Sequence, residues 1–277
     1  ATTADNNTSV GYATLTSTTT GADNVAVGRA ALNENTTGAS NTAVGKDALE
    51  NNTTADNNTA VGKDALTNNT TGSGNTAMGA VAGLTVTTGS NNALFGFGAG
   101  DAITTGANHT AIGAFTLSAV TTANDLTAIG RSVLAVNTSG SGNTGVGSNA
   151  LTANTAGNEN TAVGNISLDA NTTGSQNTAL GYSALSANTT ADFNTAIGRQ
   201  ALSVNTTGAS NVAVGGNSLD ANTTGSTNTA IGTSSLSSNT TASGNTAVGA
   251  NTLNANTTGT FNVAVGKDAL LVNTTAN

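Results

Sequence analysis

The sequence predicts an all-β fold, a parallel β-solenoid (a β-roll or β-helix) in which the chain winds through sixteen short coils. Two observations lead to this prediction. A motif typified by Asn-Thr-Ala-Val-Gly recurs sixteen times, and its final glycine advances by 17 residues at every step, without insertions. A 17-residue repeat is too short for a pair of helices, which takes more than about 30 residues. It suits one turn of a parallel β-helix with two or three short strands and tight corners.

The repeat covers the whole chain and predicts one repetitive domain, residues 1–277, with atypical coils at about 79–129. Coils stacked at the strand spacing of about 4.8 Å place each residue over its counterpart 17 positions earlier, so every position of the repeat becomes a column. We call the motif's final glycine the anchor of its coil. The anchors are Gly11, Gly28, Gly45, Gly62, Gly79, Gly96, Gly113, Gly130, Gly147, Gly164, Gly181, Gly198, Gly215, Gly232, Gly249 and Gly266.

Two columns hold large aliphatic side chains, and we predict that both form the core. One lies directly before the anchor and the other lies four residues after it. Typical members are Val27, Val44 and Val61 in the first column and Leu32, Leu49 and Leu66 in the second.

A column of small residues lies two before the anchor, mostly alanine. Neighbouring residues of a strand point to opposite faces, so this column points away from the valine column. A strand that is apolar or small on both faces is usually buried on both. The column therefore predicts a face that packs against another copy of the chain, the alternative being a monomer with a flat alanine surface. The candidate residues are Ala26, Ala43, Ala60, Ala213 and Ala264.

Polar columns predict ladders along the stack. Stacked amides can donate to one neighbour and accept from the next, and a threonine hydroxyl can bond the backbone of a corner. We expect asparagine also to supply left-handed corners. The ladder residues are Asn35, Asn52 and Asn69, seven after the anchor, and Thr36, Thr53 and Thr70, one position later. All six basic residues share the column directly after the anchor, three with an adjacent Asp, which predicts a solvent-exposed corner.

Composition argues against several functions. Only 7% of residues are charged and the net charge is −8, with no basic stripe to bind phosphates, so we expect no nucleic-acid partner. No apolar run approaches the roughly 20 residues of a membrane span, so we expect no membrane insertion. The chain has one histidine and no cysteine, and its acidic residues do not cluster. We therefore predict no catalysis, no metal site and no cofactor. Glycosylation triplets such as Asn35-Thr36-Thr37 arise from the repeat itself.

The atypical coils depart from the repeat in a concerted way. Glycine replaces leucine at 83 and 100, aliphatic residues replace asparagine at 86, 103 and 120, and three of the five phenylalanines fall here. Compensating repacking of a locally different cross-section is the interpretation we favour. The alternative is a partner-binding patch, with Phe97, His109 and Phe115 as candidates.

The motifs Asn24-Val25-Ala26-Val27-Gly28, Asn194-Thr195-Ala196-Ile197-Gly198 and Asn262-Val263-Ala264-Val265-Gly266 resemble the head repeats of trimeric autotransporter adhesins. They are also similar to repeat arrays of phage tail fibres and bacterial surface proteins. The resemblance implies a trimeric left-handed β-roll exposed on a cell or virion surface. This chain departs from the adhesin heads in its longer repeat.

These observations predict a structural or adhesive extracellular fibre or filament subunit that associates with copies of itself, as a trimer or end to end. The second hypothesis is a binding module that recognises a host or matrix surface through one face. Ice binding by rows of threonine is a further alternative. It is disfavoured because the paired threonines are adjacent and point to opposite faces.

Overall fold

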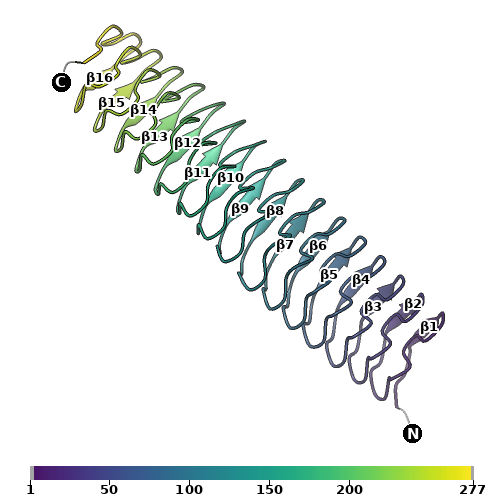
Figure 1. The fold of residues 1–277 in the computed structure, drawn as a ribbon. Helices are drawn as coiled ribbons and strands as arrows, with labels where there is room; N and C mark the ends of the chain where they lie inside the picture. Colours follow the sequence, from purple (N-terminus) through teal and green to yellow (C-terminus); the bar gives the residue numbers. More distant parts are fainter. Residues whose placement is uncertain (1–2, 276–277) are drawn as a thin grey trace. The chain divides into compact units, whose positions relative to one another are not determined.

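The computed structural model describes residues 3–275 and confirms an all-β parallel β-solenoid of 17-residue coils. The chain divides into two compact units, Ala1–Ser139 and Gly140–Asn277. In each unit the coils follow one another in chain order, and each contributes one strand to a parallel sheet (Figure 1).

The first unit contains eight three-residue strands, and neighbouring strands pair in parallel. The register is constant: Val25, Ala26 and Val27 of one strand lie opposite the residues 17 positions later. The strands are β1 (Thr8–Val10), β2 (Val25–Val27), β3 (Thr42–Val44), β4 (Thr59–Val61), β5 (Thr76–Met78), β6 (Ala93–Phe95), β7 (Thr110–Ile112) and β8 (Thr127–Ile129).

The second unit has the same construction and the same 17-residue register. Its parallel sheet runs from β9 to β16. The strands are β9 (Thr144–Val146), β10 (Thr161–Val163), β11 (Thr178–Leu180), β12 (Thr195–Ile197), β13 (Val212–Val214), β14 (Thr229–Ile231), β15 (Thr246–Val248) and β16 (Val263–Val265).

Each described coil contains one strand, not the two or three that we expected; turns make up the rest. The turns depend on left-handed backbone at recurring positions. In one coil these are Asp23 (φ 59°), Ala30 (φ 55°) and Leu32 (φ 51°), with the anchor Gly28 at φ 131°. A left-handed non-glycine residue costs about 1–2 kcal/mol. Bonds between coils offset this cost, for example the backbone N–H of Leu32 donating to the Ala48 carbonyl at 3.1 Å.

The expectation that the asparagine columns supply left-handed corners was wrong. Asn35 and Asn41 are absent from the residues with positive φ, whereas the leucine four after the anchor recurs there. A left-handed backbone at Leu49 (φ 50°) is compatible with a side chain that is fully buried. The largest side chain of the interior therefore comes from a turn, and the alternating pattern of a strand does not predict that it points inward.

The prediction for the two aliphatic columns was half right. The leucines at 32, 49 and 66 are fully buried, as expected. The valine column is not core: Val27 and Val61 are half-buried, and Val44 is exposed. In each strand the middle residue points inward and its two neighbours point outward, so valine lies on the outer surface.

The same alternation overturns the predicted oligomer face. The side chains of the alanine column line the interior of the coil. Ala26, Ala43, Ala60 and Ala213 have no exposed surface, and Ala264 in the last coil is 5% exposed. Alanine fits here because a 17-residue coil encloses a narrow space that the leucine column and two asparagine columns already fill. The alanine column contributes to the core and cannot contact another copy.

Candidate interaction surface

The outer surface of each parallel sheet is uncharged and partly apolar. It consists of the first and last residue of every strand, and we call it the outward sheet face. Threonine predominates at the first position, and a large aliphatic residue or phenylalanine occupies the last. None of the sixteen strands has a charged residue at either position. Met78 and Leu180 are each 45% exposed and Ile112 is 42% exposed, so an aliphatic stripe follows the stack in each unit.

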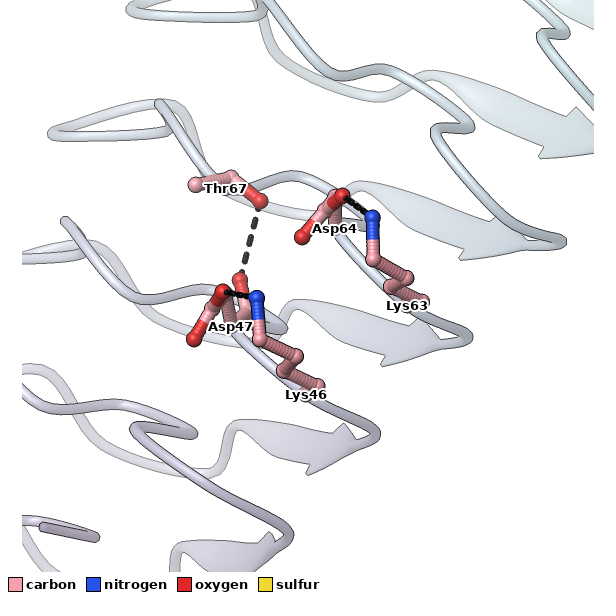
Figure 2. Close-up of polar contacts among 5 residues, drawn as sticks. All are labelled: Lys46, Asp47, Lys63, Asp64 and Thr67. Atoms are coloured by element: carbon pink, nitrogen blue, oxygen red, sulfur yellow. Dashed lines mark hydrogen bonds and ion pairs between the residues drawn. The ribbon is translucent and has the colours of Figure 1, made fainter.

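Charged residues flank the outward sheet face along one edge, directly after the anchors. Lys46 and Lys63 form ion pairs with Asp47 and Asp64, and Thr67 donates to the backbone carbonyl of Asp47 at 2.9 Å (Figure 2). The hydrogen bond from its ammonium group to Asp64 raises the pKa of Lys63. Ion pairs of such exposed lysines contribute little to stability, because solvent screens them. Their position marks where the sheet face meets solvent.

The predicted asparagine ladder exists, and it is buried. The side-chain amide of Asn52 donates to Asn35 Oδ1 at 2.9 Å and to the Ala55 carbonyl at 3.1 Å. Asn69 continues the series by donating to Asn52 Oδ1 at 3.0 Å. Each amide therefore links its own corner to the coil before it, which fixes the register of the stack.

A second asparagine column, four residues before the anchor, makes a different ladder. Asn41 accepts the backbone N–H of Asn58 at 2.9 Å, and its side-chain nitrogen donates to the Ala55 carbonyl at 2.8 Å. Oδ1 thus accepts a backbone N–H of the next coil, while Nδ2 donates to a corner carbonyl 14 residues ahead. Both ladders serve stability, so the asparagine columns carry no site for a ligand.

The threonine column also bonds as predicted. The hydroxyls of Thr36, Thr53 and Thr70 each donate to the backbone carbonyl of the threonine in the following coil, at 2.9 to 3.1 Å. The glycosylation pattern at Asn35 is explained by the same geometry. Asn35 is fully buried and its side-chain nitrogen is hydrogen-bonded to the Gly38 carbonyl, so the folded chain does not present it to an enzyme.

The atypical coils show compensating repacking, the interpretation we favoured. Leu94 occupies the alanine column of β6 and is fully buried. A Cβ atom at Gly83 would lie 2.8 Å from Leu94 Cδ1, and one at Gly100 would lie 3.0 Å from Leu94 Cδ2. One large side chain therefore fills space that two leucines occupy elsewhere. Val86 and Ile103 extend this apolar segment in place of the asparagine ladder.

The candidate patch around these coils loses one of its three members. Phe97 and Phe115 are about half exposed and pack edge to face, with ring centroids 5.3 Å apart. His109 is only 1% exposed and lies inside the coil. It cannot join the two rings on the surface because its column, four before the anchor, points inward.

His109 replaces an asparagine of the second ladder and imitates half of its bonding. Its Nδ1 accepts the backbone N–H of Leu126 at 3.3 Å, where asparagine would use Oδ1. Its Nε2 lies near the Ala123 carbonyl, but the geometry falls short of a hydrogen bond. Burial lowers the pKa of His109 to about 4, and the Ala123 carbonyl and the charge of Asp125 oppose this shift. The ring is therefore neutral at pH 7.

We expect acid to destabilise the first unit through His109. The unfolded ring titrates near 6.5 and the folded ring near 4, so its contribution is complete above pH 6.5 and is lost as the pH falls to about 4. The loss amounts to about 3 kcal/mol. Urea unfolding from pH 7.5 to 4 measures it. The His109→Asn variant serves as the control, because subtracting its profile removes the titration of the carboxylates. Parallel profiles for the two proteins would contradict the assignment.

The described residues offer little to other kinds of site. They contain no helix that could cross a membrane. They bring no three histidine, cysteine, aspartate or glutamate side chains together in a group that could hold a metal ion. No pocket opens in this part of the chain. Among the described surfaces, the outward sheet face thus has the composition most typical of an interaction surface. The chain matches no protein-family model, and no curated protein is significantly similar to it.

Proposed function

We propose that the chain is a structural or adhesive fibre element of a cell or virion surface, and that copies associate side by side through the outward sheet face. The single observation that supports this proposal is the uncharged surface of threonine and aliphatic residues repeated on every coil. Contiguous exposed apolar surface of this kind marks interaction sites in soluble proteins. The regular spacing of the columns suits a partner with the same spacing, which is another copy of the chain.

The interior of each coil supports a mechanical role. Two buried amide ladders and a threonine ladder link successive coils, in addition to the parallel strand pairing. Such repeated bonds resist the separation of neighbouring coils and fix their register. The proposal involves no catalysis, cofactor or metal.

Lysine on the outward sheet face is expected to abolish association. The variant carries Ile112→Lys and Leu180→Lys, one in each unit. Both side chains are more than 40% exposed, so the fold should tolerate the change, whereas packing against a second face would bury the charges. Light scattering over a concentration series should show two or three times 26.5 kDa for the natural chain and 26.5 kDa for the variant.

The matched control places lysine at Thr105 and Thr173, which are exposed on another side of the coil. This control should associate as the natural chain does. A natural chain that stays at 26.5 kDa at every concentration would refute the proposal. Inhibition of ice growth by such a monomer would favour a function for the threonine rows that involves ordered water. Association that survives the lysine variant would mean that a different face makes the contact.

A further inference from the structure

The six basic residues fall into two groups that differ in chemistry and in neighbours. Each lysine has an aspartate as the next residue and pairs with it, in the pairs Lys46–Asp47, Lys63–Asp64 and Lys267–Asp268. No arginine has such a neighbour, and within residues 3–275 none forms an ion pair. The arginines are Arg29, Arg131 and Arg199. Arginine is the residue best suited to bidentate pairing with a carboxylate, so three unpaired copies on one edge require an explanation.

Each arginine shares its coil with an acidic residue on the opposite edge of the outward sheet face. Arg29 follows β2 and Asp23 precedes it; Arg131 and Asp125 flank β8 in the same way. In both coils the acid stands two residues before the strand and the arginine two residues after it, and all four side chains are exposed. In the second unit Arg199 follows β12, and Asp192 precedes it by one further residue.

Within residues 3–275, Asp23 and Asp125 also form no ion pair with a cation of their own chain. Asp23 accepts a hydrogen bond from Asn6 at 3.1 Å, and Asp125 accepts one from Asn108 at 2.9 Å. Both donors are neutral amides of the preceding coil, and both carboxylates are exposed. The outward sheet face is therefore bounded by a carboxylate on one edge and a guanidinium on the other, in the same coils.

This proposal rests on the association proposed above. We propose that neighbouring copies lie parallel and in register, with Arg29 and Arg131 of each copy paired to Asp23 and Asp125 of the other. Rotation about an axis along the stack brings the acidic edge of one copy against the arginine edge of the next. Rotation about an axis across the stack makes the copies antiparallel and brings acid against acid. A shift by one coil separates the partners by about 4.8 Å along the stack.

The distances are compatible with such pairing. Sheets packed face to face lie about 10 Å apart, which a long arginine side chain and a short aspartate side chain span together. Arg199 and Asp192 add a third pair, although Asp192 Oδ1 also accepts a hydrogen bond from the Ser175 backbone N–H at 2.7 Å. The aliphatic stripe supplies adhesion that does not depend on register, because it is alike in every coil. The arginine–aspartate pairs supply the register and the direction.

Charge reversal tests the pairs. An acidic variant carries Arg29→Asp and Arg131→Asp, and a basic variant carries Asp23→Arg and Asp125→Arg. The column of Asp23 tolerates other side chains at the same left-handed φ, such as Gln176 at 58°. Each variant alone should associate about tenfold or more weakly, because like charges then meet at both edges. An equimolar mixture of the two should associate as tightly as the natural chain, since each arginine again faces an aspartate.

The control changes the same amount of charge where no acid faces it. Lys46→Asp with Lys267→Asp should weaken association much less than the acidic variant, because neither coil carries an acid on the opposite edge. An acidic variant that associates as tightly as the natural chain would overturn the assignment of the pairs. So would a mixture that remains as weak as its components.

Spin labels test the direction of the two copies, whereas the charge-reversed mixture tests their register. The chain contains no cysteine, so Thr42→Cys and, in a second sample, Thr110→Cys give single labels on the outward sheet face. Parallel copies in register give inter-copy distances below about 20 Å at both sites. The sites are four coils, about 19 Å, apart, so antiparallel copies can give a short distance at one site at most. That result would overturn this inference and leave the proposed function standing, whereas a monomeric natural chain would refute both.

Discussion

Replacing the anchor Gly45 by alanine is expected to destabilise the first unit by about 4 kcal/mol or more, the largest effect of any single substitution that we consider. A Cβ atom at Gly45 would lie 2.4 Å from the carbonyl oxygen of Gly62 and 2.7 Å from its carbon. Neither backbone atom can move without separating the coils. Gly45 also has φ 140°, a backbone conformation that residues with a side chain rarely adopt. Urea unfolding followed by circular dichroism measures the loss.

Two other glycines separate the clash from the backbone strain. Gly266 has φ 119° with nothing within 4 Å of its would-be Cβ, so Gly266→Ala should cost only the strain, about 1–2 kcal/mol. Gly216 has ordinary φ, and its nearest neighbour is the Arg199 carbonyl oxygen at 4.0 Å, so Gly216→Ala should be nearly neutral. Equal losses for Gly45→Ala and Gly266→Ala would show that close stacking is not the reason for the anchor.

Removing one amide from the first ladder is expected to cost about 2–4 kcal/mol. Asn52→Ala removes three buried hydrogen bonds, to the Oδ1 of Asn35, the Ala55 carbonyl and the side-chain nitrogen of Asn69. The Oδ1 of Asn35 then loses its donor, which costs about 1–3 kcal/mol, whereas the Ala55 carbonyl keeps its bond from Asn41 and the Asn69 amide keeps its bond to Gly72. Thermal and urea unfolding measure the effect.

Asn51 offers a control in the neighbouring position. It is half-buried and makes one side-chain bond, to Asn68 Oδ1 at 3.1 Å, so Asn51→Ala should cost no more than about 1 kcal/mol. Asn52→Asp is the isosteric test. It keeps the shape but replaces the donor by an acceptor, so it should be at least as damaging as alanine. A tolerated aspartate at 52 would mean that the ladder contributes shape and not hydrogen bonds.

The repeat length predicted the fold class, the parallel register and the amide and threonine ladders, because a fixed period of 17 leaves only one way to align the columns. It did not predict which side of the strand faces inward. Alanine and valine alternate, and the rule that larger aliphatic residues are buried gave the wrong answer for Val44 and Ala43. The interior is too narrow for valine at that position because leucine and two asparagines already fill it. The width of the interior, which the length of the coil sets, decides which side of the strand faces inward. The hydrophobicity of the side chains does not decide it.

Other features had no sequence signal that we could have used. Leucine is not a residue that indicates left-handed backbone, yet Leu32 and its counterparts adopt it because the turn delivers the side chain to the interior. The sequence suggests His109 as a surface candidate, but its column is occupied mainly by asparagine, and the structure buries nearly all of that column. The two edges of the outward sheet face can be identified only when it is known which side of the strand faces inward. Only then do Asp23 and Arg29 belong to the same surface.

The repacked coils around Leu94 bear on how such a chain can change length during evolution. Coils of the consensus type present identical upper and lower surfaces, so duplication or deletion of one 17-residue segment joins compatible neighbours and leaves the ladders continuous. Leu94 breaks this interchangeability because it fits only between Gly83 and Gly100, which belong to the coil before and to its own coil. Deleting either coil alone would leave a cavity or a collision. A change in the number of coils at this point would therefore have to alter both coils together.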